Sequence, residues 1–158
     1  MGTELTTHWS EHDAGLATIL RSLSTSLLVF DEDLTRLGLE RPENAEILRR
    51  FLVAGARHRI HIVVKNAAPL RNHSPRLFLL LATYPEQMTV VQCPQHLHSL
   101  NDALFLVNET HALIRFHKDN PRSRIIIDDR DACVPYVQRF HEIEYEGGEA
   151  ISATTLGL

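Results

Sequence analysis

Residues 101–116, with the sequence NDALFLVNETHALIRF, contain two apolar runs separated by a short polar turn. Residues 103–107 and 112–116 are made mostly of aliphatic and aromatic side chains, which favour strands, and Asn108 begins the turn between them. Two such runs so close together predict an antiparallel hairpin. Elements on both sides of this hairpin complete the predicted fold.

Before the hairpin, helical and strand patterns alternate. Apolar residues at helical spacing, together with Ser10 and Pro42 as start signals, predict helices near residues 11–23, 42–55 and 76–84. Short apolar runs predict strands at residues 26–30, 60–64 and 88–92. Because strands that alternate with helices usually pair in parallel, we expect an α/β fold with a mixed, mostly parallel sheet flanked by helices.

After the hairpin we expect a polar loop at residues 117–123, a strand at residues 124–127 and a final helix capped within residues 128–131. The whole chain, residues 1–158, is expected to be one domain. Residues 1–10 are expected to form a loose lead-in, and residues 147–158 a flexible tail.

Composition excludes some classes of partner but does not identify a function. The net charge of −4 gives no overall field that would attract nucleic acid or an anionic membrane, so neither is expected as a partner. The apolar run at residues 77–82 is far shorter than the ~20 residues that span a bilayer. Two cysteines in 158 residues suit a reducing compartment, and we expect the protein to be cytoplasmic.

The hairpin resembles the signature hairpin of the phospholipase D superfamily, H-x-K-x4-D-x6-G-S. In that frame the His position falls on Asn101, the Lys on Ala103, the Asp on Asn108 and the Gly-Ser on Arg115 and Phe116. In active members the His is a nucleophile and the Lys stabilises phosphoryl charge, which neither Asn nor Ala can do. The resemblance extends over residues 27–146 and is strongest to single-copy bacterial domains of unknown function that generally lack the catalytic residues.

This resemblance implies a non-catalytic, phospholipase D-like binding or interaction module without a cofactor. Two copies of such a domain pack with their hairpins facing each other, so a symmetric homodimer is expected. Asn101, Asn108, His111 and Arg115 would then line a ligand-binding pocket, in which Arg115 could bind a phosphate or carboxylate. The same four side chains could instead be ordinary turn or interface residues.

A second resemblance leaves an enzymatic alternative open. Residues 27–35, LLVFDEDLT, are similar to the nucleophile motif of haloacid dehalogenase-like, Mg²⁺-dependent phosphatases, with Asp31 as nucleophile and Asp33 as acid and base. Residues 125–131, IIIDDRD, are similar to the late acidic pair of that family. However, the phosphate-binding Ser or Thr is missing after the second strand, and Lys118 is the only lysine near the late pair.

Two further clusters are weaker. Cys93, His96 and His98 have a spacing that could bind zinc, but no second cluster accompanies them and no metal site is expected. Residues 49–59 are locally rich in arginine, a pattern that usually marks a solvated helix face.

Overall fold

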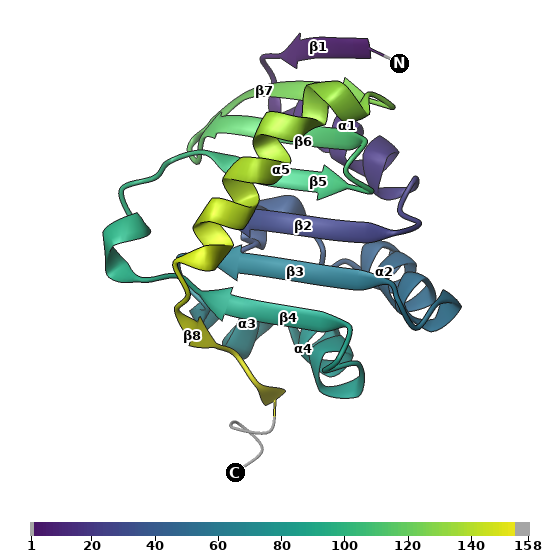
Figure 1. Cartoon of the computed structure of the whole chain (residues 1–158), viewed down its shortest axis with the longest axis vertical. Helices are drawn as coiled ribbons and strands as arrows, with labels where there is room; N and C mark the ends of the chain where they lie inside the picture. The colour runs from purple at the N-terminus through teal and green to yellow at the C-terminus, as the bar shows by residue number, and fades with distance from the viewer. Residues whose placement is uncertain (1, 154–158) are drawn as a thin grey trace.

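The computed structural model describes residues 2–153, and within them eight strands form one sheet. Their order across the sheet is β1-β7-β6-β5-β2-β3-β4-β8, as Figure 1 shows from β1 at one edge to β8 at the other. The strands are β1 (Gly2–Thr6), β2 (Ser26–Asp31), β3 (Arg59–Val64), β4 (Met88–Gln92), β5 (Ala103–Val107), β6 (His111–His117), β7 (Asn120–Ile127) and β8 (Glu149–Ala150).

The sheet is mixed, as expected, but it is mostly antiparallel rather than mostly parallel. Only the β2–β3 and β3–β4 pairs within the described residues are parallel. The other five neighbouring pairs are antiparallel. The prediction of a mostly parallel sheet was wrong because strands and helices alternate only in the first half of the chain. The hairpin, β7 and the two edge strands then add only antiparallel pairs.

Four helices cover one face of the sheet and one helix crosses the other (Figure 1). The first group is α1 (Trp9–Leu20), α2 (Pro42–Ala54), α3 (Ala68–His73) and α4 (Pro75–Thr83). The opposite face is covered by α5 (Arg130–Tyr145). Asp129 caps this helix, because its side chain accepts a hydrogen bond from the backbone N–H of Ala132 at 3.0 Å. This confirms the predicted cap within residues 128–131.

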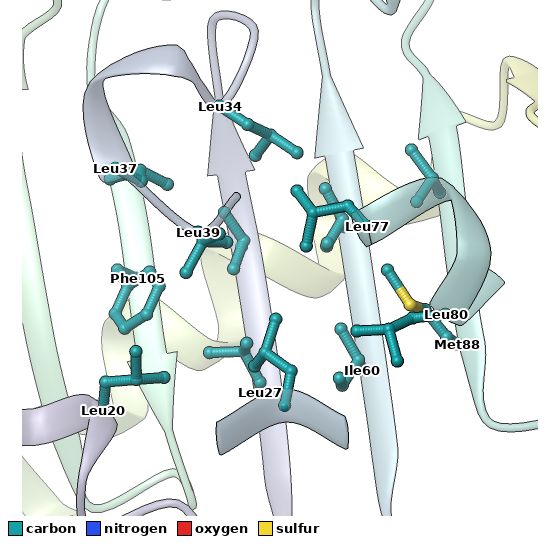
Figure 2. Close-up of a cluster of buried hydrophobic side chains, with 14 of the residues drawn as sticks. Leu20, Leu27, Leu34, Leu37, Leu39, Ile60, Leu77, Leu80, Met88 and Phe105 are labelled. Atoms are coloured by element: carbon teal, nitrogen blue, oxygen red, sulfur yellow. The ribbon is translucent and has the colours of Figure 1, made fainter. Parts of the chain in front are cut away.

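The larger of two apolar clusters lies between the sheet and helices α1–α4. Figure 2 shows Leu34, Leu37 and Leu39, which follow β2, lying over the sheet, with Leu37 and Leu39 on the side of Phe105. This connection therefore contributes to the core instead of crossing open solvent. Its burial fixes the path of the chain immediately after Asp31, where the candidate site begins.

Both ends of the chain correct the sequence prediction. The expected lead-in contains β1, which pairs with β7 from Gly2↔Ile127 to Thr6↔Ser123. The expected tail contains β8, paired with β4, and Ile151 is buried; residues 154–158 lie outside the described part. Helix α1 begins at Trp9, so Ser10 does not cap it. The carboxylate of Glu11 accepts hydrogen bonds from the backbone N–H groups of Thr7 and His8.

Two internal boundaries also differ from the prediction. Strand β7 starts at Asn120, so most of the expected loop at residues 117–123 belongs to the β6–β7 hairpin. The short helix α3 was not predicted. Among the helices of residues 2–153, none combines the length and apolar character needed to cross a membrane.

Candidate functional site

Polar side chains collect at one end of the sheet, which we call the carboxyl edge. Strands β2 and β3 end there with Asp31 and Val64, and Lys65 follows directly. Strand β6 also ends at this edge, whereas β5 runs the other way and begins there at Ala103. Several elements distant in sequence thus place charged residues close together at the carboxyl edge.

A buried ion pair lies at the centre of the carboxyl edge. Arg115 Nη2 donates to Asp31 Oδ1 at 2.8 Å, and the two side chains are 2% and 1% exposed. The other oxygen, Asp31 Oδ2, accepts from the backbone N–H of Leu34 at 2.8 Å. Both oxygens of this carboxylate are therefore used, as a buried charge requires.

The strand register explains how Arg115 reaches Asp31. Arg115 is opposite Ala103 on β5, and Phe30 on β2 is opposite Leu104. Continuing the register by one residue places Ala103 between Asp31 and Arg115 in one row across three strands. The methyl side chain of Ala103 leaves space for the guanidinium to pass over it. A long side chain at position 103 would occupy that space.

His12, from α1, is the third member of this cluster. Its Nε2 lies 3.2 Å from Arg115 Nη1, and its Nδ1 lies 2.9 Å from Asp13 Oδ1. Because a guanidinium can only donate, Nε2 must accept, so the proton is on Nδ1 and is donated to Asp13. Burial lowers the pKa of His12, with the positive charge of Arg115 acting in the same direction. His12 is therefore the neutral Nδ1–H tautomer.

The polar chain continues to the surface through Arg36. Arg36 Nη2 donates to Asp13 Oδ2 at 3.2 Å, and its guanidinium lies 3.8 Å from the ring centroid of Trp9. The Trp9 ring also packs edge-on against His12, with centroids 5.2 Å apart. We call the connected set Asp31, Arg115, His12, Asp13 and Arg36 the arginine network.

A second charge cluster lies beside the arginine network. Glu32 Oε1 is 3.4 Å from the Nζ of Lys65 and 3.7 Å from that of Lys118. Lys65 is only 4% exposed, so its charge depends on this one carboxylate for compensation. Lys118 lies at the surface.

The space beside Arg115 is closed. A void lined in part by His12, Ala103, Phe105 and Arg115 has no room for a water molecule. Arg115 is therefore packed within the protein and committed to Asp31, and it does not face a ligand cavity in the described chain. Its Nε remains buried without a hydrogen-bond partner there.

The hairpin geometry separates the four residues predicted to line a pocket. Ala103 pairs with Arg115 at the carboxyl edge, whereas Val107 pairs with His111 at the turn. The two rows are four residues apart along the strand, roughly 13 Å at ~3.3 Å per residue. Exposed Asn101 lies near Arg115, and Asn108 and His111 lie at the far end. Within one chain the four do not share a pocket.

Asn108 holds the β5–β6 turn to the start of β2. Its Oδ1 accepts from the backbone N–H groups of Ser24 and Thr25, both at 2.8 Å, and its Nδ2 donates to the carbonyl of Ser22 at 2.6 Å. Its φ of 58° lies in the left-handed region that Asn tolerates better than most residues. His111 Nδ1 is 2.8 Å from Thr110 Oγ1, a contact within the same turn.

The carboxylates of the phosphatase-like motif have structural roles. Asp31 is buried in the arginine network, and Asp33 accepts from the N–H and hydroxyl of Thr35 at 3.0 and 2.7 Å. Strand β7 runs antiparallel to β6, so Asp128, which follows it, lies at the opposite end of the sheet from Asp31. The two acidic groups cannot hold one Mg²⁺ ion between them, so this geometry contradicts the phosphatase assignment.

The cysteine and histidine residues near position 95 do not form a metal site. Cys93 is buried, and burial raises the pKa of its thiol, which disfavours the thiolate that binds metals. His96 instead contacts Glu146, with Nε2 2.7 Å from Oε1. Across residues 2–153, no three His, Cys, Asp or Glu side chains come close enough to hold an ion.

Comparison with known proteins shows the family to which the chain belongs. A family model described as a domain of unknown function, DUF7931, matches residues 8–145. The chain belongs to this family. The match includes both α1, with His12 and Asp13, and β6, with Arg115. No curated protein matches the chain.

Solved structures identify the fold as phospholipase D-like. Nuc, a phospholipase D family member from Salmonella typhimurium, has a TM-score of 0.60 at 10% identity, covering 96% of this chain and 99% of Nuc. NucT from Helicobacter pylori gives 0.57 at 10%, covering 94% of this chain and 98% of NucT. The archaeal chromatin protein TrmBL2, which has a novel mode of DNA binding, gives 0.68 at 9%, covering 94% of this chain and 54% of TrmBL2. This chain thus spans about half of TrmBL2.

The sequence alone pointed to some residues of the site but not to the contacts between them. Asp31 and Arg115 were both singled out, but for separate chemistries, and the pair spans 84 residues. His12 and Arg36 were not singled out at all. The only local signal was a histidine on the apolar side of a predicted amphipathic helix, a position that calls for a buried polar partner.

Proposed function

We propose that this chain is a phospholipase D-like domain without the phosphodiester chemistry of that superfamily and that it acts as a binding or interaction module. The observation that carries the proposal is the buried pair of Asp31 and Arg115. Side chains that a superfamily-type reaction would need free at this edge are absent or are bonded to one another. Asn101 and Ala103 supply neither a nucleophile nor a cation.

We further propose that two copies assemble as a symmetric homodimer through the carboxyl edge. Phe116 supports this, because it is a large apolar side chain, 40% exposed, at the end of β6. Asn101 and Lys118 are also exposed, and the Arg122 guanidinium lies 6.0 Å from the Phe116 ring centroid, so polar groups accompany it as at the rim of an interface. In such a dimer, Asn101 of each copy would lie near the two-fold axis.

The cytoplasm is the proposed location. Cys93 and Cys133 are both free and buried, which suits a reducing compartment. Microscopy of a fluorescent fusion expressed in its native cell tests this, and signal restricted to the cell envelope would contradict it.

Hydrolysis assays test the absence of catalysis. The purified chain is expected to release no p-nitrophenol above background from bis(p-nitrophenyl) phosphate or, with Mg²⁺, from p-nitrophenyl phosphate. An active phospholipase D-type enzyme serves as positive control for the diester. Diester cleavage by the wild type would contradict the proposal. Mg²⁺-dependent monoester cleavage that disappears in a folded Asp33→Asn variant would restore the phosphatase alternative.

A further inference from the structure

A cavity of about 240 Å³ lies between α1 and the start of α2. Three arginines line it: Arg21 after α1, and Arg36 and Arg41 from the connection between β2 and α2. Its apolar wall consists of Leu16, Ala17, Leu37 and Ile47. No local pattern in the sequence marks this cluster, because Arg21 follows α1 whereas Arg36 and Arg41 precede α2.

Two of the three guanidiniums are unpaired. Within residues 2–153, the guanidiniums of Arg21 and Arg41 make no hydrogen bond or ion pair, whereas that of Arg36 donates to Asp13. The Arg36 Nε is buried and has no hydrogen-bond partner among the described residues. Arg21 and Arg41 therefore offer free donors beside the cavity.

Two of the three arginines are also held in place before any ligand binds. Arg36 is fixed between Asp13 and the Trp9 ring. The side chain of Arg41 folds across Gly38, where a Cβ would lie 3.2 Å from its Nε, and Gly38 has a φ of +68°. No side chain caps α2, so the positive end of that helix adds to the same field. Pre-ordered groups of one charge lower the cost of binding an anion.

The number of acceptor oxygens decides which anion fits best. Asp13 and Glu43 also line the cavity, so its three arginines and two carboxylates leave a net positive charge, and Asp13 is bonded to Arg36. The guanidiniums of Arg21 and Arg41 are the two that a ligand could bridge. A phosphate monoester is an anion at neutral pH with three terminal oxygens that match the guanidinium fork, enough to contact both side chains. A carboxylate has two oxygens, which match one guanidinium fork.

We propose that this cavity binds a small phosphate monoester, with the phosphate between Arg21 and Arg41 and a compact apolar group against Leu16 and Ile47. The inference gives the proposed binding module a ligand class. It involves neither Asn101 nor Ala103, so its test is separate from the test of catalysis.

Binding of phenyl phosphate, measured by calorimetry with the full chain, tests the proposal. We expect binding to weaken about tenfold or more in Arg21→Ala and in Arg41→Ala, because each removes a charged donor. Arg57→Ala removes an equally exposed arginine elsewhere and should leave the affinity unchanged. Glu43→Gln, which removes the unpaired carboxylate at the cavity, should tighten binding.

The relative affinities of three ligands also test the proposal. Inorganic phosphate should bind more weakly than phenyl phosphate, since it lacks the apolar group, and sodium benzoate at matched ionic strength should bind more weakly still. Circular dichroism confirms that each variant is folded. Equal affinity in wild type, Arg21→Ala and Arg41→Ala, or a response that sodium chloride reproduces, would overturn the proposal. Retained phosphate binding together with diester cleavage would overturn the non-catalytic function alone.

Discussion

Arg115 combines a large charge with almost complete burial, and the residues around it account for how the fold tolerates this. Asp31 neutralises the guanidinium, and neutral His12 accepts a hydrogen bond from it. The small side chain of Ala103 leaves the space that the Arg115 side chain crosses. A buried pair of this kind often adds little net stability compared with apolar side chains, yet removing one partner is costly. The arginine network therefore helps to fix one arrangement of β2, β6 and α1.

A double-mutant cycle measures how strongly Asp31 and Arg115 depend on each other for stability. Asp31→Asn should lower the free energy of unfolding by about 3 kcal/mol or more, because it leaves Arg115 charged and unpaired in the interior. Adding Arg115→Met removes that unpaired charge, so the double variant should be more stable than Asp31→Asn alone. Urea unfolding of the four proteins gives the coupling. Simple additivity of the two single changes would contradict an ion pair between these residues.

His12 should make stability depend on pH. Its folded-state pKa is lowered by burial below the ordinary value of 6.5, so on acidification the unfolded chain binds a proton before the folded chain does. The contribution of neutral His12 is complete above pH 6.5 and is lost as the pH falls through the window below it. The loss can be at most about 1.4 kcal/mol per pH unit for one proton.

Urea unfolding at pH 7.5 and 5.5 checks this expectation. The wild type should lose more stability between the two values than His12→Gln, whose side chain can still accept from Arg115 and donate to Asp13. His96→Gln, at a largely exposed histidine, serves as the matched control. If His12→Gln and the wild type change equally with pH, His12 is not the titrating group.

At the scale of elements, local pattern predicted the central pieces well. The hairpin of β5 and β6 was expected from adjacent apolar runs, and the register Ala103↔Arg115 to Val107↔His111 confirms the pairing. The edge strands were missed for a physical reason. Strand β1 is exposed at Gly2–Leu5, and β8 has only two exposed residues, so neither has the apolar alternation by which strands are recognised.

Asn108 ties the hairpin turn to the loop before β2, and its substitution should affect stability. Asn108→Gly keeps the positive φ without strain but removes the side-chain bonds to Ser22, Ser24 and Thr25. We expect a loss of about 1.5–4.5 kcal/mol, from three bonds worth ~0.5–1.5 kcal/mol each. Asn108→Asp retains the acceptor and should lose less. Thermal unfolding of both variants tests this, and equal stability of Asn108→Gly and the wild type would disprove the role.

At the scale of the whole molecule, the carboxyl edge is the surface on which the proposed dimer depends. Phe116→Asp should convert a dimer into a monomer, since it places a charge in the interface. Val53→Asp changes an even more exposed apolar residue, on α2, and should not affect assembly. Light scattering at micromolar concentration gives the mass of each. A monomeric wild type would refute the dimer, and equal dissociation by both variants would place the interface elsewhere.

The sequence alone determined the elements whose stability is local or whose burial is periodic: the hairpin, the capped α5, and the alternation of β2, β3 and β4 with helices. The resemblance of the hairpin to that of phospholipase D also predicts that Asn101 and Ala103 occupy the nucleophile and cation positions. Only the tertiary structure decided that the sheet is mostly antiparallel and that Arg115 is buried against Asp31. It also brought Arg21, Arg36 and Arg41 to one cavity. Such outcomes depend on contacts between distant segments, whose energies are realised only when the sheet assembles, and no local pattern encodes them.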